Sequence, residues 1–148
     1  MQQLTEIRWH ARAGQGAVTA AKVVAETALS ADQYMQAMPE YGPERMGAPI
    51  RGYTRISNGP IRLHCPIAAP DVVVVLDASL IGTEDVAEGL EENGAILINT
   101  PGTPAEMRKK LGIEHSRIYT VDATRPVVDA LVVGRGMVMF AGNAAGAM

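Results

Sequence analysis

The pattern of hydrophobic and polar positions divides the chain into short segments that alternate between strand and helix periods. Leu4–His10 alternates with a period of two, which predicts a strand that a glycine-rich turn ends. From Ala17 the apolar positions recur at helical spacing to about Leu29, and Tyr34–Met38 then predicts a second short strand. The first forty residues are therefore interpreted as strand, turn, helix and strand, which is one βαβ unit.

The middle of the chain combines an irregular segment with a pattern typical of a hairpin. Pro39–Pro49 is rich in proline and glycine, and no regular element fits it. Ile50–Ile56 alternates cleanly, an Asn-Gly turn follows, and Ile61–Cys65 is predicted to return as the partner strand of an antiparallel hairpin at a sheet edge. A long irregular segment in so small a domain favours a recognition or active-site-rim loop over a plain connection.

The second half of the chain returns to regular alternation. Strands are predicted at Val72–Asp77, Ala95–Asn99 and Arg117–Val121, and helices at Thr83–Glu92, from Thr103-Pro104 to about Leu111, and from about Pro126 with an interruption at Gly134-Arg135-Gly136. The chain is therefore predicted to be a single α/β domain over residues 1–148. We expect a Rossmann-like, mainly parallel sheet with helices on both faces and an antiparallel hairpin insertion.

Composition narrows the classes of function. The 148 residues have a formal net charge of −3, which argues against nucleic acid or an anionic membrane as the main partner. The chain has one cysteine, Cys65, which alone can form neither an intrachain disulfide nor an iron–sulfur cluster site. The first residues are polar and the longest strongly apolar run, Val72–Leu76, is far too short to span a bilayer, so a cytoplasmic location without a targeting segment is expected.

The glycine-rich turn between the first strand and the first helix is one candidate site. It contains Gly14, Gln15, Gly16 and Thr19, and helix N-terminal amides there can face a phosphate, a carboxylate or an acidic group of a partner. The dinucleotide fingerprint requires a third glycine where Thr19 stands, and Asp32 precedes the second strand instead of following it. A dinucleotide site is therefore disfavoured, and a tight turn without any ligand is the plain alternative.

Two further groups of residues suggest contacts rather than chemistry. The irregular segment holds a tyrosine and an arginine, which are typical interface anchors, and its candidate residues are Tyr41, Gly42, Pro43, Glu44, Arg45 and Gly47. Arg51, Tyr53 and Arg55 share one face of the predicted hairpin, which is either solvated or a docking surface. The three histidines lie on different elements without metal-ligand spacing, and no nucleophile–base arrangement is visible. We predict neither a catalytic residue nor a metal site.

The same segments resemble a known family. Glu6–His10 and Gly14–Lys22 are similar to the start of the gamma subunit of pyruvate (2-oxoacid):ferredoxin oxidoreductases, and Tyr34–Arg45 matches the second signature of that family. The agreement continues through Gly47–Arg51, Arg55-Ile56, Asn58–Arg62 and Pro70–Asp77. The sequence departs from the family at Ala11 and Ala13, where the family usually has glycine, and at Met46, where it often has arginine. The tail after Arg125 is atypical and shorter than in other family members.

This resemblance implies a division of labour within a complex. An alpha-type subunit, a beta-type subunit with thiamine diphosphate and a ferredoxin-like delta-type subunit with [4Fe–4S] clusters are the implied partners. The gamma-type subunit binds none of these cofactors alone and helps shape the region that the substrate and coenzyme A (CoA) approach. The implied reaction is CoA-dependent oxidative decarboxylation of a 2-oxoacid, pyruvate-like or aromatic, to acyl-CoA and CO2. The Gly14–Thr19 turn and the Tyr41–Gly47 loop would then have positioning and interface roles. A freestanding nucleotide-binding Rossmann-like domain and a pure scaffold subunit are the alternatives.

Overall fold

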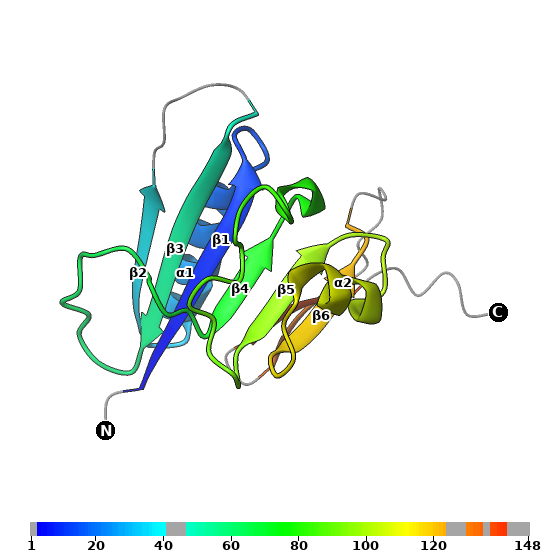
Figure 1. Ribbon diagram of the computed structural model, residues 1–148. Coiled ribbons are helices and arrows are strands. Elements are labelled where there is room, and N and C mark those ends of the chain that lie inside the picture. The colour runs from blue at the N-terminus through cyan, green and yellow to red at the C-terminus, as the bar shows by residue number, and fades with distance from the viewer. Residues whose placement is uncertain (1–2, 41–46, 124–129, 135–136, 142–148) are drawn as a thin grey trace.

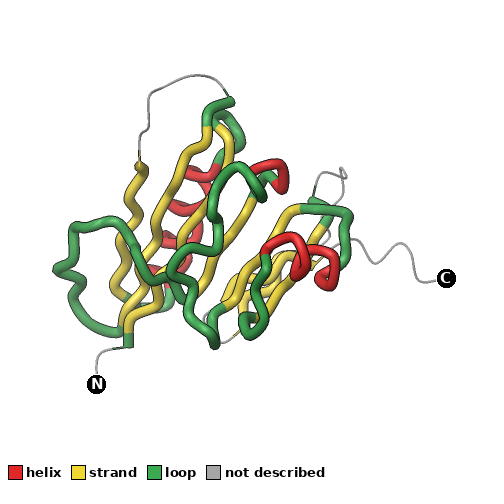
Figure 2. Tube along the Cα trace, viewed as in Figure 1, coloured by secondary structure: helices red, strands yellow, loops and turns green. Residues whose placement is uncertain are grey.

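A six-stranded mixed sheet organises the part of the chain that the structure describes (Figures 1 and 2). The structure is a computed structural model, and it describes residues 3–40, 47–123, 130–134 and 137–141. The strand order is β2-β3-β1-β4-β5-β6. The strands are β1 (Leu4–Arg12), β2 (Tyr34–Glu40), β3 (Pro49–Ser57), β4 (Val72–Val75), β5 (Ala95–Asn99) and β6 (Arg117–Val121).

The sheet has a parallel part and an antiparallel part that share β1. Strands β1, β4, β5 and β6 pair in parallel, whereas β3 is antiparallel to both β1 and β2. Helix α1 (Ala17–Ser30) connects β1 to β2, and β3 lies between these two strands. An antiparallel strand, β3, thus lies between the two strands of the predicted βαβ unit. The prediction of a mainly parallel α/β sheet with an antiparallel insertion is confirmed.

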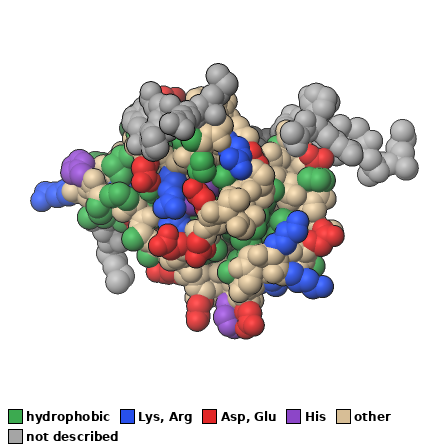
Figure 3. All heavy atoms as spheres, turned by 45° about the horizontal axis from the view of Figure 1, so that its top comes forward, with side chains coloured by type: hydrophobic (Ala, Val, Ile, Leu, Met, Phe, Trp, Pro, Cys, Tyr) green, Lys and Arg blue, Asp and Glu red, His purple; other side chains and the backbone are tan. Residues whose placement is uncertain are grey.

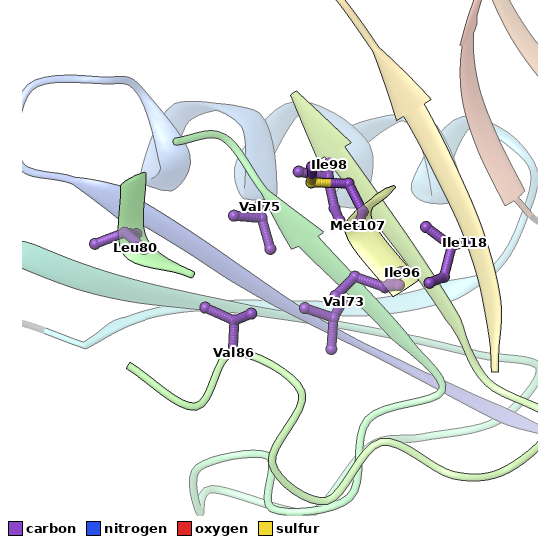
Figure 4. Close-up of a cluster of buried hydrophobic side chains, with 8 residues drawn as sticks. All are labelled: Val73, Val75, Leu80, Val86, Ile96, Ile98, Met107 and Ile118. Atoms are coloured by element: carbon purple, nitrogen blue, oxygen red, sulfur yellow. The ribbon is translucent and has the colours of Figure 1, made fainter. Parts of the chain in front are cut away.

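The two α-helices cover opposite faces of the sheet. Small side chains of α1, including Ala17 and Ala21, pack with Trp9 and Val74 on one face. Gly52 of β3 faces this helix, since a Cβ atom there would be in ordinary van der Waals contact with the Ala21 Cβ at 3.9 Å. Helix α2 (Pro104–Leu111) packs on the other face through Met107. Met107 joins an apolar cluster with Val73, Val75, Leu80, Val86, Ile96, Ile98 and Ile118 (Figure 4).

Local signals explain why α2 begins and ends where the sequence predicts. The Thr103 hydroxyl accepts from the Glu106 amide and the Glu106 carboxylate accepts from the Thr103 amide, which is a complete capping box. Pro104 occupies the first helical position, where its missing N–H costs nothing. Gly112 ends the helix with a φ of 66°, a left-handed conformation that glycine adopts readily.

The prediction that Ile61–Cys65 is a strand is wrong. These residues form no regular element, and β3 lies in the interior of the sheet with β1 and β2 on its two sides. No edge of β3 is left for a further hairpin partner. The side chain of Arg55 instead donates to the carbonyl of Cys65 at 2.9 Å, which holds this segment as a loop.

The predicted helix at Thr83–Glu92 is also absent. A 3₁₀ turn, η1 (Ala78–Leu80), follows β4, and turns lead from it to β5. Gly89 has a φ of 69°, and a Cβ atom there would lie 2.0 Å from the Ala68 carbonyl oxygen. No residue with a side chain therefore fits at this position. The guanidinium of Arg8 donates to the carbonyls of Val86 and Glu88, which a helix would use internally.

The prediction of a helix in the C-terminal part is wrong for the residues that the structure describes there. β7 (Ala130–Gly134) and β8 (Met137–Ala141) form a two-stranded antiparallel sheet. Val132 and Val133 on β7 are β-branched, which suits a strand better than a helix interior. The predicted interruption at Gly134-Arg135-Gly136 lies between the two strands, although residues 135–136 are outside the described part. That residues 1–148 form one domain stays a prediction.

Candidate functional site

The Gly14–Thr19 turn, the end of β2 and the start of β3 lie at the same end of the sheet (Figure 1). Strand β1 ends there at Arg12, which is paired with Pro49 at the start of β3. Strand β2 ends there at Glu40, which is paired with Arg51. The Gly14–Thr19 turn and both ends of segment 41–46 therefore lie together, as their common role would require. Tyr41, Gly42, Pro43, Glu44 and Arg45 themselves lie outside the described residues.

The glycine-rich turn is tied to its neighbours by hydrogen bonds. Gly14 and Gly16 have φ values of 95° and 81°, which glycine adopts without a steric penalty. The Gln15 side chain accepts from the Arg12 amide at 2.8 Å and donates to Asp77 Oδ2 at 2.7 Å. The Ala13 amide donates to the Ala48 carbonyl at 2.8 Å. The turn thus bridges the end of β4 and the start of β3.

Arg12 completes this bridge, although the sequence did not single out its side chain. Its Nε and Nη2 donate to Ser79 Oγ at 3.1 and 3.0 Å, and its Nη1 donates to the Gly47 carbonyl at 3.1 Å. Its Nε also lies 3.4 Å from Asp77 Oδ2. We call the group Arg12, Gln15, Asp77 and Ser79, with the Gly47 carbonyl, the clasp.

Asp77 is held ionised by its place in the clasp. Hydrogen bonds from Ser79 and Gln15, with a smaller contribution from the charge of Arg12, keep the pKa of Asp77 below its usual range. The sequence offered one signal for this residue, because it follows a buried parallel strand at the carboxyl end where α/β sites tend to lie. Its partners Gln15 and Arg12 could not be identified, since they are 62 and 65 positions away.

A row of charged side chains crosses β1 and β3 on the face opposite α1. Arg55 is only 1 % exposed, and its Nε lies 2.6 Å from Glu6 Oε1. Its Nη1 donates to Gln36 Oε1 on β2 at 3.1 Å. Register explains these contacts, because Arg55 is paired with Glu6 on one side and Gln36 on the other.

The predicted docking face of Arg51, Tyr53 and Arg55 is therefore not an exposed surface of this chain. Tyr53 and Arg55 are buried, and Arg51 alone is partly exposed. The Tyr53 hydroxyl donates to the Glu40 carboxylate, and burial, followed by this bond, raises the pKa of Tyr53 to about 12. The physical reason for the correction is the central position of β3, which the loop after it covers. A docking role for Arg51 stays a prediction.

His10 is fully buried within the same row. Arg8 Nε donates to His10 Nε2 at 3.0 Å, so the ring proton belongs on Nδ1. Burial and then the charges of Arg8 and Arg51 lower the pKa of His10 to about 3. Its Nδ1 lies 3.7 Å from Glu84 Oε2, and neither atom has a hydrogen-bond partner among the described residues. The geometry favours a structural role for His10, as the sequence did.

Other kinds of site receive no support from the described ranges. Within residues 3–40, 47–123, 130–134 and 137–141, no three His, Cys, Asp or Glu side chains are grouped to bind a metal ion. The same part of the chain has no helix that is both long and apolar enough to cross a membrane. The fold and the clasp define an α/β domain that places the Gly14–Thr19 turn and the start of β3 at the carboxyl ends of its parallel strands.

Comparison with known proteins names the class more closely. The family model described as pyruvate ferredoxin/flavodoxin oxidoreductase matches residues 6–148. The common subunit gamma of the pyruvate/ketoisovalerate oxidoreductases of Thermococcus litoralis is 48 % identical over 128 residues, covering 86 % of this chain and 69 % of that protein. Subunit PorC of the pyruvate synthase of Methanosarcina barkeri is 42 % identical over 144 residues, covering 97 % and 78 %.

A solved structure agrees with this assignment. The crystal structure of pyruvate oxidoreductase subunit PORC from Thermotoga maritima matches with a TM-score of 0.72 and 46 % identity. The match covers 82 % of this chain and 64 % of that chain, so this sequence spans just under two thirds of the solved subunit. The chain belongs to the pyruvate ferredoxin/flavodoxin oxidoreductase family. The resemblance and the fold class inferred from the sequence are confirmed.

Proposed function

We propose that this chain is the non-redox gamma-type subunit of a multi-subunit 2-oxoacid:ferredoxin oxidoreductase. The complex would convert a 2-oxoacid, pyruvate-like or aromatic, to acyl-CoA and CO2 and pass the electrons to an acceptor. The observation that carries the proposal is the family match over residues 6–148, supported by relatives that are gamma or PorC subunits. The proposed location is the cytoplasm.

Cofactors of this reaction are assigned to partner subunits. A [4Fe–4S] cluster takes four thiolate ligands, and the 148 residues hold one cysteine, Cys65. This chain alone therefore does not supply the ligands of a cluster. The family resemblance implies a ferredoxin-like delta-type subunit for the clusters, and a beta-type subunit next to an alpha-type subunit for thiamine diphosphate. When bound, thiamine diphosphate would supply the carbanion chemistry of decarboxylation. The described residues of this chain contribute positioning and contact surface.

The clasp end of the sheet is the proposed contact region. Gly14, Gln15, Gly16 and Thr19 border it from one side, and Gly47 borders it from the other. Segment 41–46 connects two strands that both reach this end, so Tyr41, Gly42, Pro43, Glu44 and Arg45 are proposed to meet a partner subunit, CoA or the 2-oxoacid there. Figure 3 shows the molecule with this end turned forward, where acidic and basic side chains lie side by side. Polar surfaces of this kind are typical of the rim of an interface between folded proteins.

A freestanding dinucleotide-binding domain is the second candidate, and the clasp argues against it. The Asp77 carboxylate accepts from Gln15 Nε2 at 2.7 Å, and Gln15 belongs to the turn that would have to bind a diphosphate. A carboxylate beside a phosphate is unfavourable, because like charges repel. Trp9 lies near this turn on β1 and is buried, so saturable quenching of its fluorescence by a dinucleotide would support this candidate.

Co-purification from the native host tests the proposal. We expect the tagged chain to bring down a thiamine- and iron–sulfur-containing set of partners that reduces an acceptor in the presence of a 2-oxoacid and CoA. A clean monomer without such partners would contradict the proposal.

Arg45→Ala tests the role of the loop within that complex. We expect weaker assembly or slower turnover, because arginine anchors contribute strongly at interfaces. Arg117→Ala is the matched control, since Arg117 is exposed on β6 and donates to the Asn93 carbonyl. Intact assembly and full activity in Arg45→Ala would remove the loop from the proposal. If substitutions in the loop change assembly but never the kinetics for the substrate or CoA, a pure scaffold role would be favoured.

A further inference from the structure

The clasp contains a closed circuit of hydrogen bonds that passes through Arg12 twice. The Arg12 guanidinium donates to Ser79 Oγ, and the Ser79 amide donates to Asp77 Oδ1 at 2.9 Å. Asp77 Oδ2 accepts from the Gln15 amide group, and Gln15 Oε1 accepts from the Arg12 backbone amide. Each member is oriented by the next, so the guanidinium plane has a defined direction before any partner arrives.

One contact leaves this circuit, and it reaches the backbone at Gly47, just before β3. Arg12 Nη1 donates to the Gly47 carbonyl, and the next carbonyl, that of Ala48, accepts from the Ala13 amide. Two successive carbonyls at the entrance to β3 are thus held by Arg12, at the end of β1, and by Ala13, which follows it. Gly47 has a φ of 84°, which allows the chain to turn into Pro49 at this point.

We infer that Arg12 is a positioning residue, which holds Gly47, at the entrance to β3, in register with the Gly14–Thr19 turn, so that Gly47 and the turn keep a fixed geometry toward the approaching substrates. This inference rests on the proposed function. The Arg12 side chain is 33 % exposed, and exposed ion pairs contribute little to stability. Its removal should therefore displace Gly47 more than it destabilises the fold.

The chemistry of arginine suits this task. A planar guanidinium presents five N–H donors in a fixed fork, and three of them are engaged within the described residues. A lysine at the same position has one ammonium, which can reach Ser79 or Gly47 but cannot fix both directions. Arg12→Lys keeps the charge and loses the fork, so it separates positioning from electrostatics.

Amide hydrogen exchange in the full chain is the first measurement. We expect Arg12→Gln to speed exchange of the Ala13 amide at least about tenfold, because its bond to Ala48 loses the neighbouring anchor. Arg12→Lys should give an intermediate rate. Arg117→Gln is the control, since it removes an exposed arginine that also donates to one backbone carbonyl, and it should leave Ala13 exchange unchanged.

Kinetics of the assembled complex are the second measurement. We expect Arg12→Gln to raise the KM for CoA or for the 2-oxoacid about tenfold while kcat changes less than about threefold, since misplaced binding loops weaken ground-state and transition-state binding alike. Arg12→Lys should recover part of the lost affinity. A uniform loss of active complex would instead lower the maximal rate without moving KM.

The outcomes separate this inference from the proposed function. Unchanged Ala13 exchange in Arg12→Gln, or faster exchange with an unaltered KM in an intact complex, would overturn the positioning role and leave the proposed function untouched. If the wild-type chain recruits no partners, the proposed function fails, and the positioning role in that reaction fails with it. Faster exchange together with a raised KM supports the inference.

Discussion

One face of the sheet changes from apolar to charged between two neighbouring strands. On β4, Val73 and Val75 join the apolar cluster under α2. On β1, the residues paired with them in parallel are Arg8 and His10. Parallel neighbours point to the same side of a sheet, so both rows share one face. The difference shows that this small domain stabilises its two halves by different means.

The apolar half is held by burial, and the charged half by directed hydrogen bonds. Burial of aliphatic side chains is favourable in any orientation. A buried arginine is stable only where carboxylates and carbonyls are correctly placed around it. Arg8 and Arg55 meet that requirement by binding loop carbonyls of Glu88 and Cys65. The charged half therefore holds the loop segments at Cys65 and Glu88 against the sheet, whereas the apolar half supplies a uniform core.

Loss of Arg55 should give the largest effect in this comparison. We expect Arg55→Ala to lower the free energy of unfolding by about 3 to 5 kcal/mol, because it leaves the partly buried Glu6 carboxylate without its partner. Urea denaturation measures the change, with Arg117→Ala as the exposed control. A loss below about 1 kcal/mol would mean that the charged half is not stabilised by this pairing.

Loss of Ile98 should give a somewhat smaller effect in the apolar half. We expect Ile98→Ala to cost about 3 kcal/mol, because a fully buried side chain leaves a cavity beside Met107. The matched control is Leu29→Ala, since Leu29 is exposed on α1. In the double variant with Arg55→Ala the two losses should add to within about 0.5 kcal/mol. Strong coupling would show that the two halves do not act independently.

The pH dependence of stability should report on His10. The pKa of His10 is about 3 in the folded chain and 6.5 in the unfolded chain. Between these pH values the unfolded chain binds a proton at His10 and the folded chain does not. Stability is therefore lost as the pH falls through this window, by about 2 kcal/mol between pH 7 and pH 5. In His10→Gln, the urea midpoint should change less between these two pH values than it does in the wild-type chain. An unchanged slope would assign the dependence to other groups, of which Glu84, Arg8 and Arg51 face the ring.

The cap of α2 should give the smallest effect. Thr103→Ala removes the hydroxyl that accepts from the Glu106 amide, and we expect a loss of about 1 kcal/mol. Thr103→Ser is the conservative control, because it restores an acceptor at the same position. Thermal unfolding of the three proteins measures the difference, and equal melting temperatures would show that the cap contributes nothing to the stability of this half.

Local sequence patterns predicted the structure correctly where the interactions that determine it lie within one segment. Strands β5 and β6 and helix α2 have the predicted bounds, because a buried β-branched run, a capping box and an end glycine act within a few residues. Helix α1 ends one residue after its predicted end, at Ser30. The glycine turn was located correctly for the same reason.

Segments whose structure depends on distant partners were predicted wrongly. The alternation at 61–65 suits a strand, yet β3 has no free edge to receive it. The 83–92 pattern suits a helix, yet Arg8, nearly eighty positions earlier, takes the carbonyls of Val86 and Glu88. The burial of Tyr53 and Arg55 likewise follows from the place of β3 between β1 and β2. Periodicity in a single segment contains no information about which strand will lie beside it.

By itself the sequence determined the α/β class, strands β5 and β6, helix α2, the two signature segments and the family to which they point. These depend on backbone preferences, residue order and short-range caps, all of which are present in a linear chain. Only the tertiary structure decided that both segments meet at one end of the sheet, and that Arg12, Asp77 and Ser79 join them. The reason is physical: hydrogen bonds between residues more than sixty positions apart exist only after strand order and register have brought them within 3 Å or so of one another.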